Sequence, residues 1–287
     1  MVKVTNITAK KNKHCTNDER LHEAVLKNNL DAVKKLTKVE CDVNARQTSG
    51  GKTALFYAVC YGRLDIAKAL LHNGADPDLP EDRGNTPLHE AVEKADIYMV
   101  HLLLSHKADV NAQNQRKQTA LSLSSLYGYV DIAETLLNNG ALIDHYDNEG
   151  RTPLLIALHE GNEDMARLLI SRDCDVHHCD DKGTSAFYLA IHSPNLRDIS
   201  LARLLIATGY KVQQDKSWLC ADHASPPGLF FSNRKFFYEL TGQQITDSDE
   251  CTNDFRRKSI KCKSFNQSKQ LLHEYKQGLI SDCVTHL

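Results

Sequence analysis

Apolar and polar positions along the chain repeat with a period of 33 residues. Each period opens on a hydroxyl residue, which is followed by a small residue or proline and then by an apolar residue. The five opening residues are Thr53, Thr86, Thr119, Thr152 and Ser185. A fixed period of roughly 20 to 50 residues is typical of proteins built from stacked structural repeats. The pattern therefore predicts a repeat protein.

Each period contains two predicted helices. The opening hydroxyl can accept a hydrogen bond from a backbone amide of the first helical turn, and Pro87 and Pro153 fit the first helical position. A second apolar stripe follows at Leu70-Leu71, Leu103-Leu104, Leu136-Leu137 and Leu169-Ile170. Between the two helices lie Gly62, Gly128 and Gly161, where a residue that tolerates positive φ lets the chain reverse. A hairpin loop, such as the one that starts at Gly74-Ala75-Asp76, then completes the unit.

This period and its residues resemble the ankyrin family. The best match runs from Gly84-Asn85-Thr86-Pro87-Leu88-His89-Glu90-Ala91 to Ala108-Asp109-Val110-Asn111-Ala112. The resemblance covers about residues 18–215. It implies an all-α ankyrin repeat solenoid of helix-turn-helix-hairpin units, followed by a short helical C-terminal extension. It also makes His89 a helix-start residue rather than a general base.

The period divides the chain into a series of expected segments. These are a flexible segment at 1–17, a degenerate capping repeat at 18–47, repeats at 48–80, 81–113, 114–146, 147–179 and 180–215, and a helical extension at 216–287. The capping repeat is one residue out of phase and lacks the entry motif. The last repeat carries a three-residue insertion, so His192-Ser193-Pro194-Asn195 is expected to bulge outward. Trp218 is expected to cover the final helical face.

Stacked repeats leave a concave surface of hairpin tips and inner-helix residues free for binding. The expected contact residues at the tips are Lys52, Asp82, Arg83, Asn85, Gln115, Arg116, Gln118, Asn148, Glu149 and Arg151. Those on the inner helices are Tyr61, Glu93, Lys94, Leu126, Tyr127, His159 and Glu160. Tyr61, Leu126 and Tyr127 should contribute most, because aromatic and apolar residues carry more binding energy than rim charges. The alternative is that these three pack against the adjacent repeat.

Composition narrows the class of partner. The 287 residues carry a formal charge of −2 from interspersed acidic and basic residues, which gives no reason to expect nucleic acid or a membrane as partner.

No apolar run approaches the roughly 18 to 20 residues that cross a bilayer, and the amino terminus lacks the apolar core of a secretory signal. We therefore expect a cytoplasmic or nuclear monomer. In a reducing compartment its nine cysteines stay thiols.

The strongest candidate for chemistry is Cys174-Asp175-Val176-His177-His178-Cys179, with Cys220 and His223 further along, because sulfur and imidazole at short spacing can ligate zinc. The repeat accounts for most of this segment, since Cys174 stands where neighbouring units have a buried Ala. No Gly-rich phosphate loop, nucleophile elbow or paired-carboxylate motif occurs outside the repeat. We predict no catalytic residue, no metal site, no cofactor and no enzymatic activity.

Beyond about Lys216 the period stops. Ankyrin arrays with a short helical tail resemble the adaptor family that carries a suppressor-of-cytokine-signalling box, in which a Leu-x3-Cys-x3-aliphatic helix binds elongin C and recruits a cullin ubiquitin ligase. Cys251 and Phe255 match part of this pattern, but Asp247 replaces its leading Leu. Leu279, Cys283 and Leu287 have the full spacing, but they leave no room for the cullin segment.

Two functions follow from these patterns. The leading hypothesis is an interaction scaffold or adaptor that holds a partner protein in the ankyrin groove. The alternative is a substrate-recognition subunit of a cullin-type ubiquitin ligase, whose tail binds elongin C. If the tail has no such role, it is a helical cap on the array.

Overall fold

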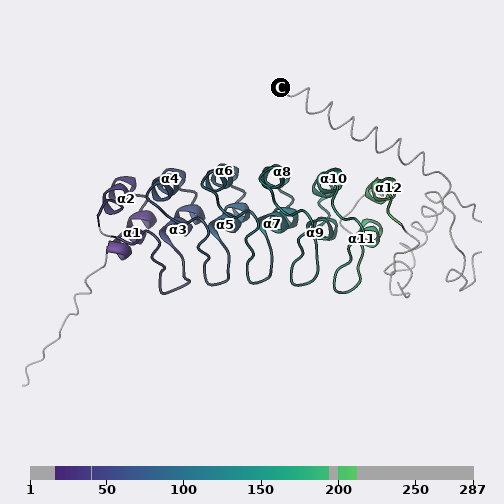
Figure 1. Ribbon diagram of the computed structural model, residues 1–287, viewed down its shortest axis with the longest axis horizontal. Coiled ribbons are helices and arrows are strands. Elements are labelled where there is room, and N and C mark those ends of the chain that lie inside the picture. Colours follow the sequence, from purple (N-terminus) through teal and green to yellow (C-terminus); the bar gives the residue numbers. More distant parts are fainter. Residues whose placement is uncertain (1–16, 40, 194–199, 212–287) are drawn as a thin grey trace, which may run out of the picture. The chain divides into compact units, whose positions relative to one another are not determined.

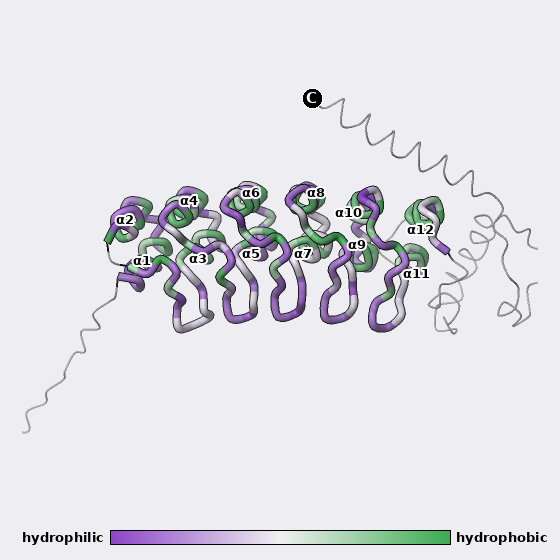
Figure 2. The backbone as a smooth tube through the Cα atoms, viewed as in Figure 1, coloured by the Kyte–Doolittle hydropathy of each residue, from purple (hydrophilic) through white to green (hydrophobic). Residues whose placement is uncertain are grey.

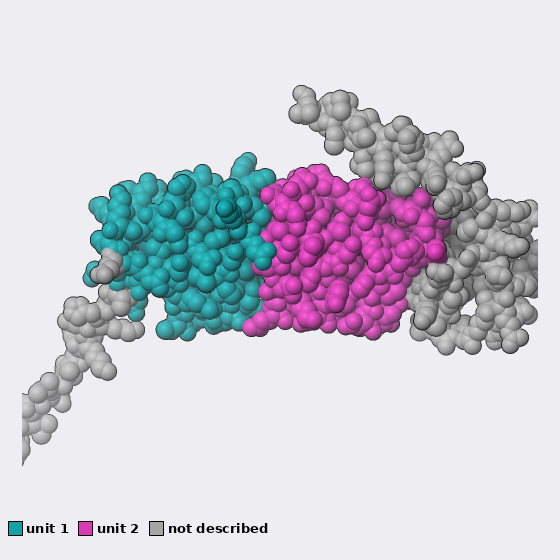
Figure 3. Space-filling view, in the orientation of Figure 1, with its two compact units in different colours: residues 1–109 teal, residues 110–287 magenta. Residues whose placement is uncertain are grey.

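The computed structural model describes residues 17–39, 41–193 and 200–211. These residues form α-helices joined by turns and hairpin loops, and they contain no strand. The chain divides into two compact units, residues 1–109 and residues 110–287 (Figure 3). The expected flexible segment at the amino terminus, the centre of the predicted insertion, Trp218 and the C-terminal extension lie outside the described residues.

The first unit contains six helices in its described residues. They are α1 (Asn17–Leu26), α2 (Leu30–Leu36), α3 (Ala54–Cys60), α4 (Leu64–His72), α5 (Pro87–Glu93) and α6 (Ile97–Ser105). Each odd-numbered helix packs against the even-numbered helix that follows it. The odd-numbered helices also pack against one another as an inner row beside the hairpins, and the even-numbered helices form an outer row (Figure 1).

The second unit repeats this arrangement. Its helices are α7 (Ala120–Tyr127), α8 (Val130–Asn138), α9 (Pro153–Glu160), α10 (Glu163–Ser171), α11 (Ala186–His192) and α12 (Ser200–Ala207). Helices α7, α9 and α11 form the inner row, and α8, α10 and α12 form the outer row. The predicted all-α unit of helix, turn, helix and hairpin is confirmed in both units.

The predicted helix caps are confirmed. The hydroxyl oxygens of Thr53, Thr119, Thr152 and Ser185 each accept a hydrogen bond from the backbone N–H three residues later, at 3.1, 3.3, 3.4 and 3.0 Å. At Thr86 the backbone N–H donates to Nδ1 of the buried His89, at 3.2 Å. His89 therefore acts as a helix-start residue, as the resemblance implied.

The core lies between the two rows of each unit. Leu70, Leu103, Leu136 and Leu169, the first members of the predicted aliphatic pairs, are all fully buried. The hairpin loops, in contrast, are largely hydrophilic, while apolar residues gather on the helices (Figure 2). No helix in the described residues has both the length and the apolar character needed to cross a bilayer.

Side-chain oxygens in the hairpins bond to the backbone of the following hairpin. In the first unit Asn44 Oδ1 accepts from the N–H of Asp76, at 2.8 Å. In the second unit Asn111 Oδ1 accepts from the N–H of Leu142, also at 2.8 Å. These bonds fix the register between successive hairpins, and so they place the hairpin tips at regular intervals beside the inner row.

Candidate protein-binding surface

The inner surface of the first unit consists of Lys52, Tyr57, Cys60, Tyr61, Glu90, Glu93 and Lys94. Tyr61 is its most exposed aromatic residue, with 56% of its surface accessible. The ring stacks on Tyr57 with centroids 6.4 Å apart, and the guanidinium of Arg63 lies 4.9 Å from its centroid. Tyr61 is therefore both exposed and held in one orientation.

A chain of polar contacts links α3 to α5 on this surface. The Cys60 thiol donates to Oε1 of Glu90 at 2.9 Å, and Lys94 Nζ lies 3.6 Å from the same oxygen. Lys52 Nζ is 3.9 Å from the Cys60 sulfur and 5.0 Å from the ring centroid of Phe56. Burial, and then the neighbouring Glu90 carboxylate, raises the pKa of Cys60 to about 11, so the thiol is protonated at neutral pH.

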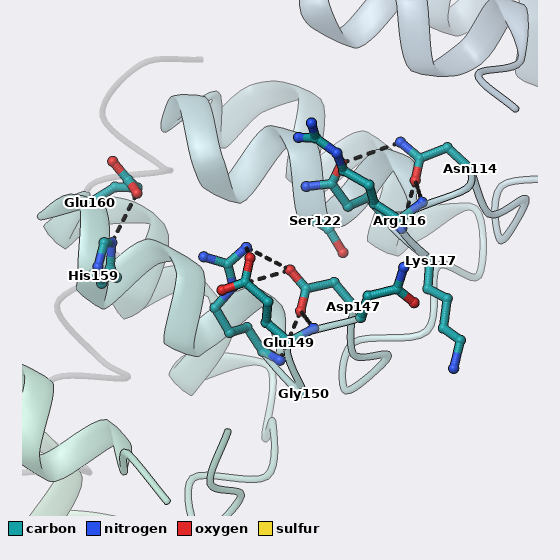
Figure 4. Close-up of polar contacts among 12 residues, drawn as sticks. Asn114, Arg116, Lys117, Ser122, Asp147, Glu149, Gly150, His159 and Glu160 are labelled. Carbon is teal, nitrogen blue, oxygen red and sulfur yellow. Dashed lines mark hydrogen bonds and ion pairs between the residues drawn. The ribbon is translucent and has the colours of Figure 1, made fainter. Parts of the chain in front are cut away.

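The second unit places Tyr127 on its inner row. Tyr127 is 44% exposed and stacks on Tyr129, with ring centroids 5.5 Å apart. Leu126 is half-buried, while His159 and Glu160 are exposed. Nδ1 of His159 lies 3.0 Å from Oε1 of Glu160 (Figure 4). The predicted residues of this inner row thus reach the surface to different degrees.

Four of the hairpin tips are each organised by one side-chain oxygen that the sequence patterns above did not identify. The residues are Glu81, Asn114, Asp147 and Asp180. Asp147 Oδ1, for example, accepts from the N–H groups of Glu149 and Arg151 at 2.9 and 3.0 Å (Figure 4). The four residues are 33 apart, which is the signal that could have identified them. These hydrogen bonds fix the backbone conformation of the four tips.

Two residues expected at the tips turn back into their hairpins. The Gln118 side chain is buried, and its Oε1 accepts a hydrogen bond from Nδ2 of Asn114 at 3.2 Å. Arg151 is half-buried and pairs with Asp147 at 2.8 Å and with Glu149 at 3.2 Å. Gln118 therefore shapes the hairpin and offers little surface to a partner, because its polar group is satisfied within the loop.

The other tip residues lie at the surface. Asp82, Arg83, Gln115, Arg116, Asn148 and Glu149 are exposed, and Lys52 and Asn85 are half-buried. Backbone bonds join neighbouring tips, as where the N–H of Asn148 donates to the carbonyl of Arg116 at 3.0 Å. The residues predicted to bind elongin C, which are Cys251, Phe255, Leu279, Cys283 and Leu287, lie outside the described residues.

In the cysteine- and histidine-containing segment of the second unit, Cys174 and His177 make packing contacts. Cys174 is buried, and burial raises its pKa to about 12. The ring of His177 stacks on Tyr210 with centroids 5.0 Å apart. Across the part of the chain that the structure describes, no three His, Cys, Asp or Glu side chains are grouped so as to hold a metal ion. Cys220 and His223 lie outside that part.

A family model described as "Ankyrin repeats (3 copies)" matches residues 2–81, 76–147 and 140–216. Human protein phosphatase 1 regulatory subunit 27 is 45% identical over 67 residues, which are 23% of this chain and 43% of that protein. The ubiquitin-protein ligase Ufd4 of Drosophila melanogaster is 46% identical over 67 residues, 23% of this chain and 2% of its own length. Mouse 2-5A-dependent ribonuclease is 40% identical over 70 residues, 24% of this chain and 10% of its own. Each match covers less than half of the relative.

Proposed function

The chain belongs to the ankyrin repeat family, and from this premise we propose that it is a scaffold or adaptor that holds a partner protein against the inner rows and hairpin tips of its units. Ankyrin repeats are protein-interaction modules, and their stacked units present extended binding surfaces. The observation that carries the proposal is that each inner row presents one exposed tyrosine. Tyr61 stacks on Tyr57, and Tyr127 stacks on Tyr129.

These tyrosines have the properties of binding anchors. A large aromatic side chain that is already ordered loses little conformational entropy when a partner covers it. Tyrosine is also among the residue types that dominate the binding energy of protein interfaces. The exposed charged residues around them, such as Glu93, Lys94 and Arg116, would form the polar rim that surrounds such anchors.

Site-specific cross-linking tests which face the partner covers. The photoreactive amino acid p-benzoylphenylalanine would replace His159 on the inner row or, in a control, Asp131 on outer helix α8; both positions are exposed. We expect a discrete cross-linked partner from position 159 and none from position 131. Cross-links from position 131 alone, or equally from both positions, would contradict the proposal.

A second candidate function is substrate recognition for a cullin-type ubiquitin ligase. It is favoured by the Leu279, Cys283 and Leu287 spacing, which is that of an elongin C-binding helix. Against it, the other candidate box has Asp247 at the anchor position, and an unpaired carboxylate buried in an apolar pocket would cost several kcal/mol. The ligase activity in the name of Ufd4 belongs to a protein matched here only over a short segment.

We therefore expect elongin B and C to co-purify weakly or not at all with the full-length protein. Stoichiometric co-purification that is lost in Cys251→Asp or Cys283→Asp variants would make the ligase adaptor the leading function.

A further inference from the structure

Four side chains of the first unit form a cluster in which each of two stacked tyrosines carries a cation. Tyr57 and Tyr61 lie one turn apart along α3 and its C-terminal cap, and their ring centroids are 6.4 Å apart. Lys52 Nζ lies 5.8 Å from the Tyr57 centroid, and the Arg63 guanidinium lies 4.9 Å from the Tyr61 centroid. We call these four residues the cation–tyrosine cluster. Tyr61 is exposed and the other three are half-buried, so the cluster reaches the surface.

Neither cation of the cluster has a carboxylate partner in the part of the chain that the structure describes. Lys52 Nζ makes its polar contact there with the Cys60 sulfur, at 3.9 Å. The Arg63 side chain makes no hydrogen bond or ion pair with a described residue, and its Nη1 is buried without a partner. A tyrosine ring attracts a cation through its quadrupole but carries no net charge. The rings therefore hold both cations in place without neutralising them.

Carboxylates on the neighbouring elements are already engaged or outnumbered. Glu90 on α5 pairs with Lys94, whose Nζ lies 3.6 Å from its Oε1. Asp96 caps α6 through its Oδ1, so the amides of the first helical turn balance its charge, and it forms no ion pair with Arg63. Glu93 adds one negative charge against the two positive charges of the cluster. The surface around the cluster therefore favours an incoming anion over an incoming cation.

Equivalent positions in the following three repeats lack this combination. Arg63 is replaced there by Asp96, Tyr129 and Asn162, and Lys52 is replaced by Asn85, Gln118 and Arg151. Arg151 is the one cation among these residues, and it is neutralised by Asp147 at 2.8 Å. The cluster is thus confined to one place in the array, which is typical of a recognition site and not of a packing feature that every repeat reuses.

We propose that the cation–tyrosine cluster recognises an acidic segment of the partner protein, in which a carboxylate accepts hydrogen bonds from the Arg63 guanidinium. Arginine suits this role because its planar fork can donate two parallel hydrogen bonds to a carboxylate. Stacking on Tyr61 orients that fork in advance, so little side-chain freedom is lost on binding. Lys52 adds a second positive charge to the same surface. The inference rests on the proposed function and names the chemistry of the segment that this part of the surface selects.

Peptide selection tests the inference. A phage library of random 12-residue peptides would be selected against immobilised full-length wild type, Arg63→Gln, Arg63→Glu and Lys68→Gln proteins. Lys68 is exposed on outer helix α4 of the same unit, so Lys68→Gln is a matched control for the loss of one positive charge. Among peptides whose binding is lost in Tyr61→Ala, wild type and Lys68→Gln should enrich aspartate or glutamate at one position. That enrichment should disappear with Arg63→Gln, and Arg63→Glu should select basic residues instead.

A synthetic peptide from the wild-type selection then gives the magnitude. Replacing its selected carboxylate with the corresponding amide should weaken binding about tenfold or more, as expected when a charge-assisted hydrogen-bonded pair is lost. In the Arg63→Gln protein the same replacement should have little effect, because the two groups act on each other. Lys52→Gln should weaken binding of the acidic peptide by a smaller factor, since Lys52 contributes charge without the paired hydrogen bonds. Retained helical circular dichroism would show that each variant folds.

The outcomes separate this inference from the proposed function. Tyr61-dependent peptides without acidic enrichment, or with enrichment that survives Arg63→Gln, would refute the acidic site and leave the binding function intact. Enrichment of arginine or lysine by the wild-type protein would refute it as well. If neither Tyr61→Ala nor Tyr127→Ala affects the binding of any selected peptide, the proposed function fails together with the inference.

Discussion

Single residues decide the turns between the paired helices. Gly62, Gly128 and Gly161 have positive φ angles of 62°, 74° and 80° at this turn. The same turn in the unit of α5 and α6 contains Ala95, with φ of 54°. An L-residue with a side chain is strained by about 1 to 2 kcal/mol in this region, whereas glycine is not.

Replacing Ala95 with glycine should therefore stabilise the protein. The relief of strain exceeds the extra unfolded-state entropy of glycine, so the urea midpoint should rise by an amount equivalent to about 0.5 to 1 kcal/mol. Ala69→Gly within α4 is the matched control and should lower the midpoint, because glycine in a helix interior costs about 1 kcal/mol. A lower midpoint for Ala95→Gly would mean that the turn is not strained.

The Cys60 thiol should react slowly with alkylating agents. Its pKa of about 11 leaves very little thiolate at pH 8, so iodoacetamide should modify it roughly tenfold more slowly than an unperturbed thiol, even allowing for the higher nucleophilicity of a more basic thiolate. Glu90→Gln should increase the rate, because it removes the neighbouring charge, while Asp65→Asn should not. Peptide-resolved mass spectrometry measures both rates; an unchanged rate in Glu90→Gln would contradict the contact.

At the scale of the helix, α7 differs from the other inner-row helices. Ser125 is fully buried, and its hydroxyl has no hydrogen-bond partner among the residues that the structure describes. The four equivalent positions hold Val59, Val92, Leu158 and Ile191. An unsatisfied buried hydroxyl costs about 1 to 3 kcal/mol, so Ser125 lowers the stability that α7 contributes.

Ser125→Val should consequently raise the free energy of unfolding by about 1 to 2 kcal/mol, because it replaces an unpaired hydroxyl with the residue found in two equivalent slots. The control is Ser124→Ala. The Ser124 hydroxyl donates to the carbonyl of Leu121 at 2.8 Å, and its removal should change the free energy of unfolding less. Urea denaturation followed by circular dichroism distinguishes these expectations. A destabilised Ser125→Val would show that the slot cannot accept the larger side chain.

The outer-row leucines test the repeat register. Leu103 and Leu136 are both fully buried, so truncating either to alanine should leave a cavity and destabilise by about 2 to 5 kcal/mol. Lys68→Ala, an exposed position on α4, should shift the urea midpoint very little. Equal shifts for Leu136→Ala and Lys68→Ala would mean that the assigned register is wrong.

At the scale of the whole molecule, the 33-residue period made the fold predictable because each repeat reuses the same caps, turns and buried slots. The hairpin acceptors were harder to predict, since Glu81, Asn114 and Asp147 share a role but differ in residue type. Burial of Gln118 follows from a side-chain bond within its own loop, which no periodic pattern encodes.

The central claim is that the inner rows bind the partner, and tyrosine substitutions test it most directly. Full-length Tyr61→Ala/Tyr127→Ala would be compared with wild type and with Tyr98→Ala, which removes a tyrosine that is 73% exposed on outer helix α6. Partner proteins retained by each tagged protein would be quantified by mass spectrometry, with circular dichroism as the check on folding. The account predicts at least a tenfold loss of the partner in the double variant and none in Tyr98→Ala. Equal retention by all three proteins, or loss of helical structure in the double variant, would contradict it.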